Sequence, residues 1–159
     1  MKKVDLLWLG NICRSPAAEA IFKTQVQKAG LSSNFFIDSA GTSAYHQGSP
    51  ADERMRQFAH KRGYDINSLS RPFTSPKDFN EFDYIITMDQ KNHRDVLSVA
   101  KTELQSSKVF SMTEFCHIHN VDHVPDPYYQ GDEGFELVLD ILEDACSGFL
   151  KKISTGSET

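Results

Sequence analysis

This sequence has few cysteines, no long apolar run and no excess of basic residues. Each of these three features excludes some classes of protein. Its three cysteines, Cys13, Cys116 and Cys146, have no paired spacing, which disfavours a disulfide scaffold and fits a reducing compartment. No apolar run approaches the roughly 20 residues of a membrane span, and the first residues lack the apolar region of a signal peptide. A formal net charge of −5 argues against nucleic-acid binding, which usually needs a basic surface. The sequence therefore predicts a cytoplasmic protein that binds neither membranes nor nucleic acid.

The length of 159 residues, 39% of them hydrophobic, suffices for one domain with a sizeable core. We expect residues 1–159 to form this single domain, with a flexible polar tail at 153–159. Apolar runs predict strands, apolar residues at helical spacing predict helices, and Gly30 and Gly63 stand where helices end. The alternation of the two favours an α/β fold with a parallel sheet and helices on both faces. The predicted strands are 4–7, 35–39, 82–88 and 109–112, and the predicted helices are 16–28, 51–62, 90–100 and 135–149.

The stretch between the first strand and the first helix has the features of an anion-binding loop. Gly10 and Asn11 tolerate left-handed backbone, which lets successive N–H groups point at one centre. Ser15 is a favoured N-cap and Pro16 a favoured first helical residue, so the helix dipole adds positive potential. Arg14 supplies a forked guanidinium that matches two phosphate oxygens. An ordinary strand-to-helix turn is the alternative interpretation of these residues.

The sequence Leu-Gly-Asn-Ile-Cys-Arg-Ser-Pro-x-Ala-Glu at residues 9–19 resembles the phosphate-binding loop of the low molecular weight protein tyrosine phosphatases. The resemblance extends over about residues 3–152 and implies a three-layer α/β sandwich with a four-stranded parallel sheet. It also implies hydrolysis of phosphotyrosine in proteins, or of small aryl phosphates, without a metal or other cofactor. Inorganic phosphate would then be a ligand, and the expected assembly is a monomer or a weak dimer.

The resemblance also implies roles for the loop and its neighbours. Arg14 and the loop N–H groups stabilise the charged oxygens of the phosphate. Hydrogen bonds from Asn11, Ser15 and Ser39 hold the loop in shape, and Asp89 is a structural cap beside it. Without the resemblance, Ser39 would be an ordinary residue at a strand end. The residues implied to contact phosphate are Leu9, Gly10, Asn11, Ile12, Cys13, Arg14 and Ser15.

A second motif, Val-Pro-Asp-Pro-Tyr-Tyr at residues 124–129, contains one carboxylate between two prolines. From the residues alone, the prolines stiffen a loop and indicate only a turn. The motif resembles the Asp-Pro-Tyr-Tyr loop of the same family, which implies that Asp126 is the general acid that protonates the leaving phenolate. Tyr128, Tyr129 and Tyr45 are then expected to wall the substrate cleft. Their alternative is a plain surface or loop-tip position.

Trp8 departs from the family pattern Cys-x5-Arg, because it stands six residues before Arg14, where the family has its nucleophilic cysteine. An indole N–H is a donor without an available lone pair, so Trp8 cannot attack phosphorus. Cys13 does not fit that role easily, since the same spacing counted from Cys13 ends at Glu19, and a buried or flanking thiol is the favoured interpretation of Cys13. Losing the nucleophile of a covalent enzyme costs about 10⁶ in rate, so we expect severely impaired activity. The Trp8 ring would also fill the position in the loop that the phosphate group occupies, unless the ring turns away into the sheet.

Two alternatives to an impaired phosphatase stay open. One is a pseudophosphatase, a binding or regulatory module that forms complexes without turnover. The other is an arsenate reductase, which shares the loop but needs further redox cysteines close to it. Cys116 and Cys146 lack the close spacing of such a relay, and we expect both in the core.

Three histidines, His117, His119 and His123, cluster in the sequence before the second motif. Such a run is able to bind zinc in some proteins. No cysteine pair accompanies it and the segment has no predicted helix or strand. A solvated or hydrogen-bonded cluster is therefore favoured over a metal site.

Overall fold

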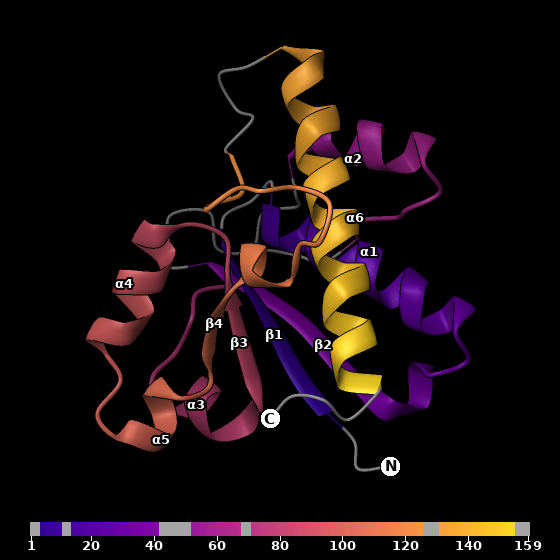
Figure 1. Cartoon of the computed structure of the whole chain (residues 1–159). Helices are drawn as coiled ribbons and strands as arrows, with labels where there is room; N and C mark the ends of the chain where they lie inside the picture. The colour runs from indigo at the N-terminus through magenta and orange to yellow at the C-terminus, as the bar shows by residue number, and fades with distance from the viewer. Residues whose placement is uncertain (1–3, 11–13, 42–51, 68–70, 126–130, 155–159) are drawn as a thin grey trace.

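A four-stranded parallel sheet forms the centre of the molecule (Figure 1). The computed structural model describes residues 4–10, 14–41, 52–67, 71–125 and 131–154. The strands lie in the order β2-β1-β3-β4, and every neighbouring pair is parallel. The predicted α/β fold with its four-stranded sheet is thus confirmed. The strands are β1 (Val4–Gly10), β2 (Phe35–Gly41), β3 (Tyr84–Thr87) and β4 (Val109–Ser111).

Helices cover both faces of this sheet and give the expected three layers (Figure 1). On one face lie α1 (Arg14–Lys28), α2 (Glu53–Lys61) and α6 (Asp132–Ser154). On the other lie α3 (Lys77–Glu81) and α4 (Gln90–Ser98). Shorter elements are α5 (Glu103–Ser106) before β4 and the 3₁₀ turns η1 (Ser32–Asn34) and η2 (Met112–Phe115). Within the described ranges, no helix is both long enough and apolar enough to cross a membrane.

β1 is buried on both faces and contributes to two separate cores. Leu6 and Trp8 point into the core between the sheet and α1, α2 and α6. Leu7 and Leu9 point into the core under α3 and α4. A parallel strand buried in this way appears in the sequence as a continuous apolar run, which is what residues 6–9 show. The first residues of the predicted phosphate loop, Leu9 and Gly10, therefore lie in the buried centre of the domain.

Local sequence signals correctly predict one end of α1, of α2 and of α4. Gly30 and Gly63 have φ values of 72° and 89°, in the left-handed region that favours glycine after a helix. Asp89 precedes α4, and its carboxylate accepts a hydrogen bond of 2.7 Å from the backbone N–H of Asn92. The predicted helix ends and the predicted cap are confirmed.

The structure differs from the predicted elements at three places. α1 begins at Arg14, so Ser15 lies inside the first turn and is not the N-cap. The helices α3 and α5, of five and four residues, were not predicted, because so few residues show no apolar period. α6 runs through Ser154 and Ile153 is buried, so the domain includes the first two residues of the predicted tail.

Candidate functional site

The predicted phosphate loop follows β1 at the carboxyl edge of the sheet. β1 lies between β2 and β3, and the chain continues from β1 into α1 on one face and from β3 into α4 on the other. Ligands of parallel α/β sheets bind outside the carboxyl ends of the strands, where the connections diverge in this way. The topology therefore places Arg14, Ser39 and Asp89 at the same edge, each at or just beyond the end of a strand.

Arg14 is the fixed positive charge of this edge. The residue is 4% exposed, and its Nη1 lies 2.9 Å from Asp89 Oδ2 and donates a 2.7 Å hydrogen bond to the carbonyl of Val124. Asp89 thus binds Arg14 in addition to capping α4, a second contact that its predicted role as a cap did not include. The Val124 carbonyl was also missed, because a backbone acceptor leaves no signal in the sequence. Two partners from distant segments of the chain hold the guanidinium in one orientation.

The predicted supporting serines connect α1 to β2. The Ser15 hydroxyl donates to the carbonyl of Ala40 at 3.3 Å. The Ser39 hydroxyl donates to Glu19 Oε1 at 2.6 Å, and Lys23 lies 2.5 Å from the other oxygen of this buried carboxylate. Both serines therefore fix the first turns of α1 against the end of β2. Glu19, which lies within the loop motif, was not expected to be part of the support.

Gly10 has a different reason to be glycine than the one the sequence indicated. It is the last residue of β1. Among the described residues, positive φ values occur at Gly30 and Gly63 and not at Gly10. A Cβ atom at Gly10 would lie 2.7 Å from Met88 Cγ and 3.3 Å from Ser15 Cβ. Gly10 does not adopt the left-handed backbone that glycine tolerates, and the close approach of Met88 and Ser15 explains the residue.

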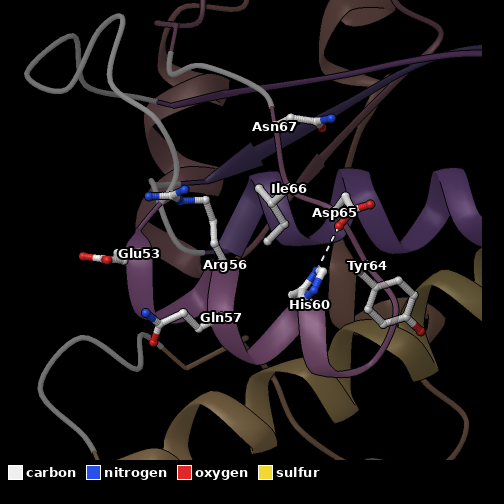
Figure 2. A pocket seen from close by; sticks show the side chains of 8 residues that line it. All are labelled: Glu53, Arg56, Gln57, His60, Tyr64, Asp65, Ile66 and Asn67. Atoms are coloured by element: carbon white, nitrogen blue, oxygen red, sulfur yellow. Dashed lines mark hydrogen bonds and ion pairs between the residues drawn. The ribbon is translucent and has the colours of Figure 1, made fainter.

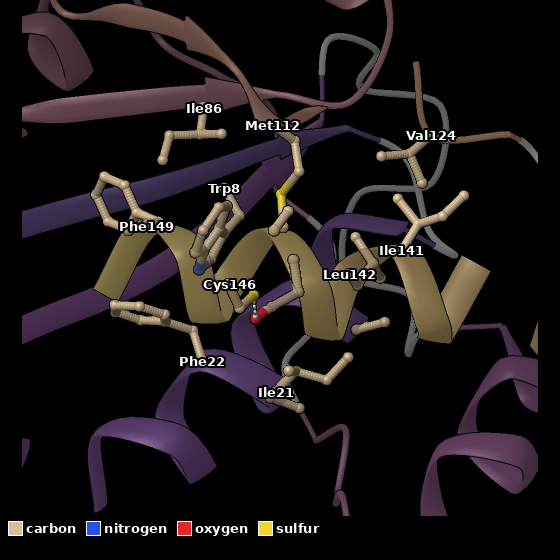
Figure 3. Packing of buried hydrophobic residues seen from close by; sticks show 14 of the residues in the cluster. Trp8, Ile21, Phe22, Ile86, Met112, Val124, Ile141, Leu142, Cys146 and Phe149 are labelled. Carbon is tan, nitrogen blue, oxygen red and sulfur yellow. Dashed lines mark hydrogen bonds between the residues drawn. The ribbon is translucent and has the colours of Figure 1, made fainter. Parts of the chain in front are cut away.

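Trp8 lies in the hydrophobic core and is 0% exposed (Figure 3). Its ring packs edge-on against Phe22 of α1 and Phe149 of α6, with centroid separations of 5.5 and 5.9 Å. The indole Nε1 has no hydrogen-bond acceptor among the described residues. Of the two orientations that the sequence left open, the structure shows the one in which the ring turns into the interior of the domain.

Several predicted site residues lie outside the described residues. They are Asn11, Ile12 and Cys13 of the loop, the cleft residue Tyr45, the acid Asp126, and Tyr128 and Tyr129. Their roles stay predictions. Leu9, which was expected to contact phosphate, is described and is fully buried in the core under α3 and α4. Its side chain therefore supports the sheet, which leaves only its backbone for a ligand.

The histidine cluster before the second motif is hydrogen-bonded to carboxylates. Nδ1 of His117 and Nδ1 of His119 lie 3.1 and 2.9 Å from the two oxygens of Asp144, and His123 bonds Asp122 at 2.8 Å. This is the hydrogen-bonded cluster that the sequence favoured. Across the described ranges, no group of three or more His, Cys, Asp or Glu residues is arranged to hold a metal ion.

The two described thiols are protonated at neutral pH. Burial and the charge of the nearby Asp144 raise the pKa of Cys116 to about 12. Burial raises the pKa of Cys146 well above its usual value. Because the thiolate is the reactive form of cysteine, neither residue suits the redox relay of an arsenate reductase.

A separate hollow of about 470 Å³ lies along α2 and the segment after it (Figure 2). Its walls carry side chains of both charge signs, and His60 pairs with Asp65 across 3.1 Å. None of the predicted site residues that the structure describes lines this hollow. The candidate site therefore stays at the carboxyl edge of the sheet.

The sequence of this chain and its structure both resemble those of known proteins of one family. Residues 3–158 match the family model of the low molecular weight phosphotyrosine protein phosphatases. A low molecular weight phosphotyrosine protein phosphatase from Schizosaccharomyces pombe is 41% identical over 156 residues, which cover 96% of this chain and 99% of the relative. The human protein of that name is 36% identical over 154 residues, 95% of either chain. A crystal structure of a protein tyrosine phosphatase from Entamoeba histolytica superimposes with a TM-score of 0.91 at 46% identity, covering 98% of this chain and 99% of the other.

Proposed function

Because this chain belongs to the low molecular weight protein tyrosine phosphatase family, we propose that it recognises phosphotyrosine in proteins and hydrolyses it with severely impaired activity. Small aryl phosphates and inorganic phosphate would bind at the same loop. The buried Arg14, held by Asp89 at the carboxyl edge of the sheet, is the observation that supports recognition. The impairment follows from Trp8, which stands at the position of the nucleophilic cysteine.

Arg14 binds and orients the phosphate group in this proposal. Asp89 and the Val124 carbonyl fix its guanidinium before any ligand arrives, so little conformational freedom is lost on binding. The N-terminus of α1 adds backbone N–H groups and a positive dipole end. As charge develops on the phosphoryl oxygens in the transition state, the same groups stabilise it without having to reorganise.

Asp126 is the proposed general acid. It would protonate the oxygen of the departing phenolate, which is a poor leaving group without a proton. Val124, two residues before it, accepts from Arg14 and donates its N–H to Met88 at 2.8 Å. We call residues 124–129, which contain Asp126, the acid loop. The two hydrogen bonds connect Val124, at the beginning of the acid loop, to Arg14. Tyr45, Tyr128 and Tyr129 are proposed to wall the cleft around the aromatic ring of the substrate.

Trp8 is proposed to prevent the first chemical step. In the family reaction, a thiolate forms a bond to phosphorus while the bond to the phenolate oxygen breaks, and water later cleaves the phosphocysteine. No atom of an indole is able to form that bond. Loss of a covalent nucleophile lowers the rate by about 10⁶, which corresponds to roughly 8 kcal/mol of activation free energy.

A pseudophosphatase that acts as a binding or regulatory module is the second candidate. The burial of Trp8 favours it, because the ring fits among Phe22 and Phe149 without exposing apolar surface, so the fold accommodates the loss of the nucleophile. Such a module would retain phosphorylated partners and release no phosphate. Its expected location in the cytoplasm and its expected monomeric or weakly dimeric state stay predictions.

Hydrolysis of p-nitrophenyl phosphate at mildly acidic pH, by this chain and by Trp8→Cys in parallel, tests the proposal. We expect turnover to rise about 10⁶-fold after the substitution, since the thiol is the single missing group. Comparable activity of both proteins would reveal another nucleophile and contradict the mechanism. If neither is active, isothermal titration with phosphate separates the candidates: binding that Arg14→Met abolishes supports the binding module, and no binding refutes both. Micromolar affinity for phosphate would also show that the Trp8 ring does not occupy the phosphate-binding position.

A further inference from the structure

Residues 117–123 lead into the acid loop, and the carboxylate of Asp144 binds the first three of them to α6. Asp144 has a side chain that is 1% exposed, and its two oxygens accept the backbone N–H groups of three successive residues. The donors are His117 at 3.0 Å, Ile118 at 3.0 Å and His119 at 2.8 Å. The Nδ1 atoms of the same two histidines complete the shell at 3.1 and 2.9 Å.

Asp144 carries its negative charge under all ordinary conditions. Burial by itself would raise the pKa of this carboxyl, but the backbone N–H groups of residues 117–119 and the ring of His119 hold the pKa well below its usual range. Hydrogen bonds to an ionised acceptor are about twice as strong as those between neutral groups. The segment is thus fastened by several charge-assisted bonds to a single side chain.

Apolar packing does not hold this segment in place. From residue 117 to residue 123 every side chain is exposed or partly exposed, and Ile118 is 75% exposed. Packing begins only at the two ends. At the first end, the carbonyl of Phe115 lies so close to α6 that a Cβ atom on Gly148 would come within 1.9 Å of it. At the other end Val124 is fully buried.

The second end is the part of the segment that touches the candidate site. The Val124 N–H donates to the Met88 carbonyl at 2.8 Å, and its own carbonyl accepts from Arg14 at 2.7 Å. Residues 120–123 connect this point to the stretch bound by Asp144, and Asp126 follows two residues later. We propose that Asp144 is a positioning residue, which holds residues 117–119 on α6 so that Val124 stays bonded to Arg14 and the acid loop starts from a fixed point. This inference rests on the proposed function for the role of Asp126.

Site-resolved hydrogen exchange on the full chain tests the positioning directly. Asp144→Asn keeps the size of the side chain but removes the charge and one acceptor. We expect the amides of residues 117–119 and of Val124 to exchange at least about tenfold faster, because local opening exposes them, while β1 amides are unchanged. Asp140→Asn is the matched control, since Asp140 lies one turn earlier on α6, is 51% exposed and pairs with Arg62. It should leave Val124 unchanged.

Three exchange results would overturn the inference. One is a Val124 amide that keeps its rate in Asp144→Asn while residues 117–119 accelerate. Another is equal acceleration of every slow amide, which would mean that Asp144 only stabilises the whole fold. The third is the same effect on Val124 from Asp140→Asn. None of these results depends on catalytic activity, so the outcome stands even if the proposed function fails.

A kinetic comparison of two substrates in the Trp8→Cys background measures how well the proposed general acid, Asp126, protonates the leaving group. Phenyl phosphate needs protonation of its leaving group more than p-nitrophenyl phosphate does. Adding Asp144→Asn should therefore lower kcat for phenyl phosphate several-fold more than kcat for p-nitrophenyl phosphate, with KM little changed. An equal loss with both substrates would contradict a role in positioning the acid loop. If Trp8→Cys is itself inactive, the proposed mechanism fails, and the exchange result alone decides this inference.

Discussion

Trp8→Cys is expected to restore a nucleophile and to destabilise the fold at the same time. The Trp8 side chain is fully buried, and its ring contacts Phe22 and Phe149 edge-on. Truncating a buried Trp to Ala costs about 3–5 kcal/mol, because apolar burial is lost and a cavity remains. The cysteine side chain recovers about 1 kcal/mol of that burial. Removing the indole N–H, which has no acceptor, returns at least about 1 kcal/mol. The free energy of unfolding should therefore fall by about 1–3 kcal/mol.

Thermal and urea denaturation measure this cost, and p-nitrophenyl phosphate hydrolysis measures the gain. For a chain of this size, each kcal/mol lowers the Tm by about 2–4 °C, so a decrease of about 4–8 °C is expected for a middle value. Trp8→Phe is the control, because it keeps an aromatic ring in the cavity and removes only the unpaired donor. Its stability should lie within about 1.5 kcal/mol of the parent, with no gain in hydrolysis.

Two results would refute this reasoning. If Trp8→Cys is as stable as the parent protein, the ring does not contribute to the core in solution as the structure indicates. If Trp8→Phe is as destabilised as Trp8→Cys, the indole makes a polar contact that the geometry does not show. A destabilised Trp8→Cys that stays inactive would leave the packing argument intact but contradict the assignment of position 8 as the nucleophile.

Three further predictions concern neighbouring parts of the structure. Gly10→Ala should lower the free energy of unfolding by about 1–3 kcal/mol in urea, because the new Cβ overlaps Met88, and Met88→Ala should relieve part of that loss. Cys116 should react slowly with iodoacetamide at pH 8, as followed by mass spectrometry, and faster in Asp144→Asn, which removes the charge that helps to raise its pKa. The stability that Asp144 contributes should be complete above about pH 4 and fall as the pH drops toward its lowered pKa; a loss already at pH 6 would contradict this.

The sheet and the long helices could be predicted because their signals are local. A buried apolar run shows β1, and a capping aspartate at 89 shows the start of α4, without any knowledge of the rest of the chain. Short helices such as α3 lack a full apolar period and give no such signal. The start of α1 was misplaced for a related reason: Ser15 and Pro16 match a favoured cap, but the hydroxyl of Ser15 is used to reach Ala40 on β2.

The partners of the site residues could not be predicted, because they are distant in sequence or belong to the backbone. Arg14 was predicted from the loop motif, yet Asp89 and Val124, which bind it, lie in segments that the motif does not contain. Val124 contributes a carbonyl 110 residues away, which any amino acid would supply. Asp144 likewise binds three backbone N–H groups, so neither its own position nor theirs leaves a pattern. Such contacts depend on the tertiary fold alone.

The proposed loss of the thiolate would change the charge of the loop as well as its chemistry. A thiolate at position 8 would repel a phosphate dianion over a few ångström, and like charges at that distance oppose binding. Trp8 brings no charge, so we expect Arg14 and the N-terminal end of α1 to attract the ligand without this repulsion. With the ring turned into the core, this chain should bind phosphate at least as tightly as Trp8→Cys, and its affinity should lack the pH dependence of a thiol. The residue that is proposed to prevent catalysis would thereby favour retention of a phosphorylated ligand, which is the property that a binding module needs.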